Sequence, residues 1–140
     1  MILEVERIDQ IQQLVEQLPV KVQWLETPYD APGPGITWRG NIRNIVGATL
    51  PKLVDDFTYS ICLHEFGHVY GELKSDWYGS KYAGELEAWV WARRNCLGVW
   101  SAPMQEAMEH GLYSHIDNPY SGLTKPMVQN FLQTLEKGVV

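Results

Sequence analysis

Residues 63–68 read Leu63-His64-Glu65-Phe66-Gly67-His68, and this stretch decides how the rest of the chain is interpreted. It contains His-Glu-x-x-His, in which two histidines four residues apart share one face of a helix. Two imidazoles in that arrangement can bind one metal ion, and the glutamate between them is placed to act as a base. His64 and His68 are therefore candidate metal ligands, and Glu65 is a candidate catalytic residue.

The composition indicates one soluble globular domain over residues 1–140. Hydrophobic residues make up 45% of the chain and charged residues 20%, which is typical of a folded domain. The formal net charge is −6 and no basic run occurs, so a direct nucleic-acid partner is not expected. Neither a signal peptide nor an apolar run of about 18 residues is found, so we expect a cytoplasmic protein with no membrane contact.

Periodicity and turn residues predict a mixture of helices and short strands. Apolar positions at helical spacing predict helices over 5–18, 57–71, 82–97, 101–111 and 126–137. Alternation predicts a strand over 20–24, and the dipeptide Gly40-Asn41 predicts a hairpin between strands 36–39 and 42–46. The expected fold class is therefore α+β, with a small sheet and its hairpin packed against the helix that carries the motif.

The motif helix is expected to be buried. Tyr59, Leu63 and Phe66 form an apolar stripe on one side, while the two histidines and Glu65 lie mostly on the other. Asp55 or Asp56 can cap the start of this helix, where a negative charge is favourable. The polar side of the helix should therefore face a cleft.

A catalytic zinc site normally has three protein ligands, so a third donor is needed. An extension of the motif to a third histidine is ruled out, because Lys74 stands at that position. Glu85 and Glu87 on the following helix are the remaining candidates, and they point about 200° apart. Glu85 shares its face with Ala88 and Ala92, small residues that permit close packing against the motif helix, and this favours Glu85.

Between about residues 42 and 97 the chain resembles the ImmA/IrrE-type zinc metallopeptidases of bacteria and phages. The resemblance lies in Asp56-Phe57-Thr58, in the His-Glu-Phe-Gly-His core, and in the pattern Glu-x-x-Ala-x-x-x-Ala that begins at Glu85. Trp89 departs from that family, whose members often have Asn or Asp directly after the first alanine of the pattern. The differences continue at Trp91 and in Asn95-Cys96-Leu97.

The resemblance implies a minimal zincin-like metallopeptidase domain that binds Zn²⁺ through His64, His68 and Glu85. It also implies that the substrate is a protein, with a separate DNA-binding repressor as one class of target. In the implied reaction Glu65 takes a proton from the metal-bound water and returns it to the leaving amine. A further donor is needed for the developing oxyanion, and we select His115 as a catalytic residue for this role.

Several alternatives remain open at this stage. Tyr113, Tyr78 and Tyr82 are the other candidates for the oxyanion donor. The strand edge over 41–46 is expected to hold an extended peptide by strand addition. Two alternative functions also remain open. The protein could be a non-proteolytic module that binds zinc for stability or for partner binding, or a toxin-like peptidase that an antitoxin inhibits.

Overall fold

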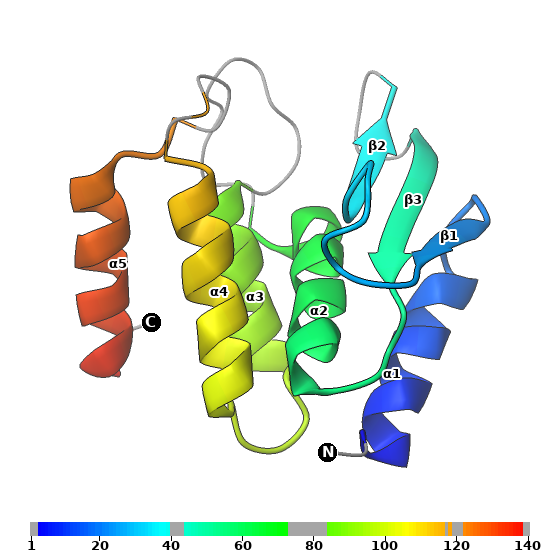
Figure 1. Ribbon diagram of the computed structural model, residues 1–140, viewed down its shortest axis with the longest axis horizontal. Helices are drawn as coiled ribbons and strands as arrows, with labels where there is room; N and C mark the ends of the chain where they lie inside the picture. Colours follow the sequence, from blue (N-terminus) through cyan, green and yellow to red (C-terminus); the bar gives the residue numbers. More distant parts are fainter. Residues whose placement is uncertain (1–2, 40–43, 73–83, 117, 119–121, 139–140) are drawn as a thin grey trace.

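The computed structural model describes residues 3–39, 44–72, 84–116, 118 and 122–138 (Figure 1). Within these residues the fold is α+β, with five helices and a three-stranded mixed sheet. The elements in chain order are α1 (Val5–Glu16), β1 (Val22–Leu25), β2 (Gly35–Trp38), β3 (Ile45–Pro51), α2 (Asp56–Tyr70), α3 (Glu85–Asn95), α4 (Ala102–Ser114) and α5 (Lys125–Glu136). None of the described helices is long and apolar enough to cross a membrane.

The sheet has the strand order β1-β3-β2, with β1 parallel and β2 antiparallel to β3. The predicted hairpin pairing is confirmed, although its turn at 40–43 lies outside the described residues. Residues 41–43 of the predicted peptide-binding edge at 41–46 lie outside the described residues. Ile45 pairs with Trp38 of β2, whereas β1 pairs with β3 only over residues 48–51, so a peptide-binding edge at 41–46 stays a prediction. The alternation predicted around β1 is also broken, since Trp24 is 39% exposed while Leu25 is buried.

Helix α2 is the central element of the fold. It contacts α1, β2 and β3 on one side and α3 and α4 on the other (Figure 1). Asp55 caps its start, because the Asp55 carboxylate accepts a hydrogen bond from the Thr58 backbone N–H at 2.9 Å while the Thr58 hydroxyl oxygen accepts one from Asp55 N–H. The predicted burial is confirmed, since Leu63 and Phe66 are fully inaccessible to solvent.

The later helices follow the predictions with one clear difference. Helix α3 lies within the predicted helix over 82–97, and α5 corresponds to the predicted helix over 126–137. Thr124 caps the start of α5. Helix α4 does not stop near 110–111 but continues to Ser114. Gly111 therefore lies inside the helix, and a Cβ atom placed there would be only 3.3 Å from Cζ2 of Trp89. The glycine allows the indole ring to approach the helix and does not terminate it.

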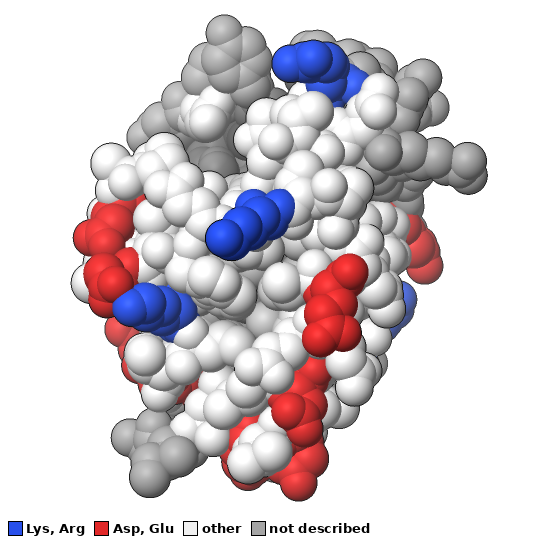
Figure 2. All heavy atoms as spheres, turned by 90° about the vertical axis from the view of Figure 1, so that its right-hand side faces the viewer, with Lys and Arg blue, Asp and Glu red and all other residues white. Residues whose placement is uncertain are grey.

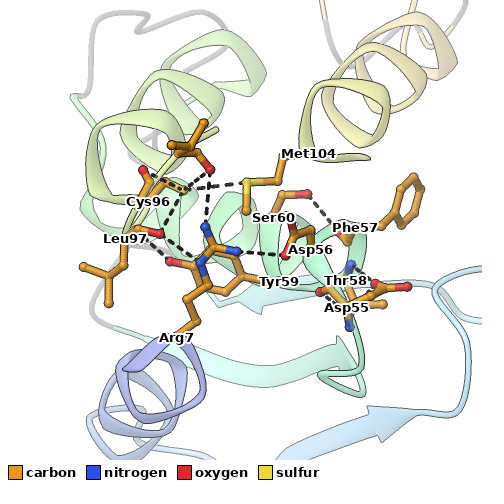
Figure 3. Close-up of polar contacts among 12 residues, drawn as sticks. Arg7, Asp55, Asp56, Phe57, Thr58, Tyr59, Ser60, Cys96, Leu97 and Met104 are labelled. Carbon is orange, nitrogen blue, oxygen red and sulfur yellow. Dashed lines mark hydrogen bonds and ion pairs between the residues drawn. The ribbon is translucent and has the colours of Figure 1, made fainter. Parts of the chain in front are cut away.

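A buried ion pair joins α1 to the beginning of α2 (Figure 3). Nη1 of Arg7 donates to the Asp56 carboxylate at 2.8 Å, and Nε of Arg7 donates to the carbonyl of Leu97 at 2.8 Å. The guanidinium carbon also lies 5.0 Å from the centre of the Tyr59 ring. Arg7 thus connects three parts of the chain, namely α1, α2 and the segment that follows α3.

Candidate metal centre

Three polar side chains are buried side by side on α2. His64, Glu65 and His68 are only 7%, 6% and 8% exposed, and the ring centres of the two histidines are 4.7 Å apart. Donor atoms of the three residues all lie within 4.8 Å of one another, so this group could hold a metal ion. Buried polar side chains cost free energy unless they are paired or coordinate a metal, which makes this cluster the candidate functional site.

Glu85, the first residue of α3, reaches both histidines. Its Oε2 atom lies 2.8 Å from Nε2 of His64, and its Oε1 atom lies 3.2 Å from Nε2 of His68. Glu87 points elsewhere and lines a separate groove with Tyr70 and Trp91. The structure therefore brings Glu85, and not Glu87, to the two imidazoles, in agreement with the packing argument from the sequence.

A close contact between α2 and α3 explains how Glu85 reaches the histidines. Gly67 lies directly against Ala88, and a Cβ atom at Gly67 would be 2.3 Å from the carbonyl oxygen of Ala88. Ala88 and Ala92 are both fully buried, as their small size predicted. The sequence analysis recognised the small residues on α3 but missed Gly67 as their partner, although it lies inside the motif itself.

The charge on Glu85 is stabilised by its neighbours. Burial by itself would raise the pKa of this carboxyl. The electrostatic interaction with the neighbouring His64, together with hydrogen bonds to His64 and His68, outweighs this effect and holds the pKa of Glu85 well below its usual range. The side chain is therefore an anion at neutral pH, which is the form that coordinates a metal ion.

The separations of the two glutamates from the histidine nitrogens can be compared with the donor spacing of a tetrahedral metal site. Bonds of about 2.0–2.1 Å at tetrahedral angles place neighbouring donors about 3.3 Å apart. The separations from Glu85 to the two Nε2 atoms, 2.8 and 3.2 Å, are close to this value. Glu65 fits less well as a ligand, because its Oε1 atom is 3.9 Å from Nδ1 of His64 and 3.9 Å from Nε2 of His68. The Glu85 carboxylate lies next to Nε2 of both histidines, whereas the Glu65 carboxylate lies next to Nδ1 of His64 and Nε2 of His68.

Trp89 forms one wall of the site. Its ring stacks on the His64 imidazole at a centroid distance of 4.1 Å and an interplanar angle of 14°. Trp89 is itself 2% exposed and meets Trp100 edge to face on another side. From the sequence this tryptophan is a departure from the family pattern and is predicted to belong to the core or to a groove wall, which its burial and its place in the pocket lining confirm. Its position one residue after Ala88, at the contact with α2, was the signal that could have placed it here.

A pocket opens beside the cluster on the side of Glu65. Its volume is about 160 Å³, and its lining includes His64, Glu65, Trp89 and His115. Nε2 of His115, at the end of α4, lies 3.5 Å from Oε1 of Glu85, and its side chain is 36% exposed. The structure thus brings the predicted oxyanion donor to the site, and a small molecule or a segment of chain in this pocket would meet both Glu65 and His115.

Among the other oxyanion candidates only Tyr113 belongs to the described residues, and it does not line this pocket. Tyr113 is 41% exposed and lines a larger neighbouring groove instead. Tyr78 and Tyr82 lie outside the described residues. His110 and Tyr29 also line the pocket. His110 lies in α4, which extends beyond the end at residue 111 that the sequence predicted.

Charged side chains are scattered over the face shown in Figure 2. Lys and Arg side chains stand singly there among uncharged residues, and acidic side chains gather in separate groups. Among the described residues visible in that view, basic side chains form no continuous stripe. A stripe of that kind is the usual electrostatic mark of a nucleic-acid interface.

Comparisons of this chain with protein-family models, with curated proteins and with solved structures found no match. The resemblance to the ImmA/IrrE-type metallopeptidases therefore stays a prediction from the motif residues.

Proposed function

We propose that this protein is a zinc-dependent metallopeptidase with a zincin-like arrangement of its sheet and active-site helices. The observation that carries the proposal is that two buried glutamates have different neighbours. Glu85 contacts both imidazoles, whereas Glu65 lines the pocket in which a substrate would meet His64. A purely structural zinc site is closed by its ligands and has no use for a second carboxylate directed at a pocket.

Zinc is the metal that this donor set suits best. His64, His68 and Glu85 provide two nitrogens and one carboxylate, a combination that occurs in catalytic zinc sites, whereas calcium and magnesium prefer oxygen donors. When bound there, zinc would lower the pKa of a water ligand to about 7 and polarise the scissile carbonyl.

The protein side chains perform the proton transfers and orient the substrate. The Glu65 carboxylate accepts a proton from the attacking water and then delivers it to the nitrogen of the leaving amine. Nε2 of His115 donates a hydrogen bond to the carbonyl oxygen as that oxygen gains negative charge. Trp89 keeps the His64 ring in a fixed orientation by stacking against it.

Among the described strands β2 lies at one edge of the sheet, and an extended peptide can add to such an edge. Pro34, which directly precedes β2, lines the same pocket as His64 and Glu65. A peptide that adds to this edge as a further strand would therefore pass the candidate metal centre. We infer that the substrate is a protein or peptide, and a separate DNA-binding repressor is the first class of target to test. The cytoplasmic location expected from the sequence stays a prediction.

Substitution of Glu65 tests the proposal. The Glu65→Gln protein should bind one zinc ion per chain as the wild type does, and it should lose peptide cleavage by about 10²-fold or more. Glu87→Gln is the matched control and should retain cleavage, because Glu87 lines a different groove. Zinc content is measured by elemental analysis, and cleavage by mass spectrometry of a peptide mixture. Equal cleavage by the wild type and the Glu65→Gln protein would contradict the proposal.

A further inference from the structure

A second, larger groove adjoins the catalytic pocket. Its volume is about 740 Å³, and it shares Tyr29, Phe57 and His110 with the lining of the smaller pocket. Its floor is one face of α4, where Glu106, Glu109 and Tyr113 follow each other at helical spacing. A peptide held in the catalytic pocket would therefore place a neighbouring side chain in this groove.

The groove is acidic on one side. Glu106 is exposed and Glu109 is half-buried, and none of the described residues that line the groove is Lys or Arg. Neither glutamate forms an ion pair with a residue in the described part of the chain. Two carboxylates three residues apart on one helix face repel each other. A cationic group between them would remove this repulsion.

Aromatic rings also line the groove. Tyr29 is 71% exposed, and its ring lies 6.3 Å from that of Phe57 and 6.2 Å from that of His110. Aromatic faces attract the positive ends of Lys and Arg, and they also cover the aliphatic stems of these side chains. Carboxylates and aromatic rings in one groove are the usual surroundings of a bound cationic side chain.

From these observations we propose that the groove receives a lysine or arginine side chain of the substrate, next to the bond that is cleaved. The proposal rests on the proposed peptidase function, and it names the substrate class more closely. Glu106 and Glu109 are then specificity-determining residues, because they contact the substrate but take no part in the proton transfers at Glu65. Tyr29 provides an aromatic face.

A random-sequence peptide library tests this assignment in two ways. Binding is measured with the zinc-loaded Glu65→Gln protein, and cleavage is measured with the zinc-loaded wild type. Lys and Arg should be enriched at one position of the bound and cleaved peptides. The double substitution Glu106→Gln/Glu109→Gln should reduce this enrichment by about threefold to tenfold, as expected for the loss of two partly exposed charge pairs. Charge reversal to lysine at both positions should favour Asp and Glu instead.

The control is the double substitution Glu6→Gln/Glu16→Gln on α1, which changes the net charge equally at two exposed positions and should leave the enrichment unchanged. Cleavage without enrichment of Lys or Arg would overturn the groove assignment and leave the peptidase function in place. Enrichment among bound peptides without cleavage by the wild type would support the groove and overturn the peptidase function. If the protein neither binds nor cleaves any peptide, both are overturned.

Discussion

Trp89 shows how one residue can tune the candidate metal centre without contacting a metal. Its ring stacks on His64 at 4.1 Å, so it limits the rotation of that imidazole. Groups that orient a metal-binding histidine typically contribute 10- to 100-fold to metal affinity. We therefore expect Trp89→Leu to weaken zinc binding by about 10- to 100-fold, whereas Trp89→Phe retains the stacked face and stays within a few fold of the wild type. Competition with a chromogenic chelator measures both affinities.

The comparison between the two Trp89 variants separates stacking from packing. Both substitutions shorten a side chain that is 2% exposed, so both should lower the free energy of unfolding. Only Leu removes the aromatic face. Equal zinc affinities of the Leu and Phe variants, measured under conditions in which both are folded, would contradict a role for the stack.

Tyr59 gives the protein a predictable response to alkaline pH. Burial raises the pKa of its hydroxyl to about 12, although a hydrogen bond from the Leu97 backbone N–H partly opposes this. The folded pKa is above the unfolded value of about 10, so the neutral hydroxyl stabilises the fold below pH 10. This contribution, about 2 kcal/mol, is lost as the pH rises from about 10 to 12.

Substitution of Tyr59 should therefore change the pH dependence of stability. Tyr59→Phe is expected to lose a little stability at pH 8, where hydrogen bonds to Gln10 and Leu97 disappear, and to show a smaller decrease between pH 8 and 11 than the wild type. Urea unfolding at several pH values measures this. Tyr70→Phe, at a position that is 43% exposed, is the control. A decrease in Tyr59→Phe as steep as in the wild type would argue against the assignment.

At the scale of elements, the distance between α2 and α3 depends on Gly67. A methyl group there would be 2.3 Å from the carbonyl oxygen of Ala88, so Gly67→Ala must push the helices apart and move Glu85 away from the histidines. We expect a stability loss of about 1–3 kcal/mol and weaker zinc binding. Gly35→Ala is the control, because a Cβ atom at Gly35 meets nothing within 4 Å. Zinc affinity is measured by calorimetry, and stability by urea unfolding. If the Gly67→Ala protein had the zinc affinity and stability of the wild type, that result would contradict the close contact.

The junction of α1 with α2 depends on a buried ion pair. Removal of one partner leaves the other charge buried and unpaired, so Arg7→Met should destabilise the protein by about 3–5 kcal/mol. The pair Lys52–Glu26 is the control, since its side chains are 49% and 75% exposed and Lys52→Met should cost less than about 1 kcal/mol. Both values come from denaturant unfolding. Similar losses for the two variants would show that the Arg7 pair is not isolated from water.

The elements also show what the sequence could and could not predict. Helix α2, its cap and the small face of α3 depend on local periodicity and residue size, and these were predicted. The course of α4 past Gly111 was not, because the role of that glycine depends on Trp89, which lies 22 positions earlier in the chain. The central position of β3 was also missed, since strand order is decided by packing against α2 and not by alternation within a strand. Whether Glu85 binds zinc stays a prediction, although its contacts were correctly anticipated.

At the scale of the whole molecule, the site links parts of the chain that are separate in sequence. His64 and His68 come from α2, Glu85 from α3 and His115 from the end of α4, and all of these helices meet around α2 (Figure 1). A ligand that binds this assembled site stabilises the folded state, because the unfolded chain does not hold the donors together. Metal binding should therefore be visible as a change in global stability.

We expect zinc at about 100 times its Kd to raise the free energy of unfolding by about 2.7 kcal/mol, which corresponds to a Tm increase of roughly 10 °C for a domain of this size. Glu85→Ala should remove this increase, whereas Glu65→Gln should retain it, because Glu65 lies farther from the shared Nε2 atoms. Thermal unfolding with zinc, and with magnesium as a control, measures the shift. If Glu85→Ala were stabilised as much as the wild type while Glu65→Gln were not, the two glutamates would have exchanged roles. Glu65 would then complete the metal site with His64 and His68, and the proposed catalytic base would be lost.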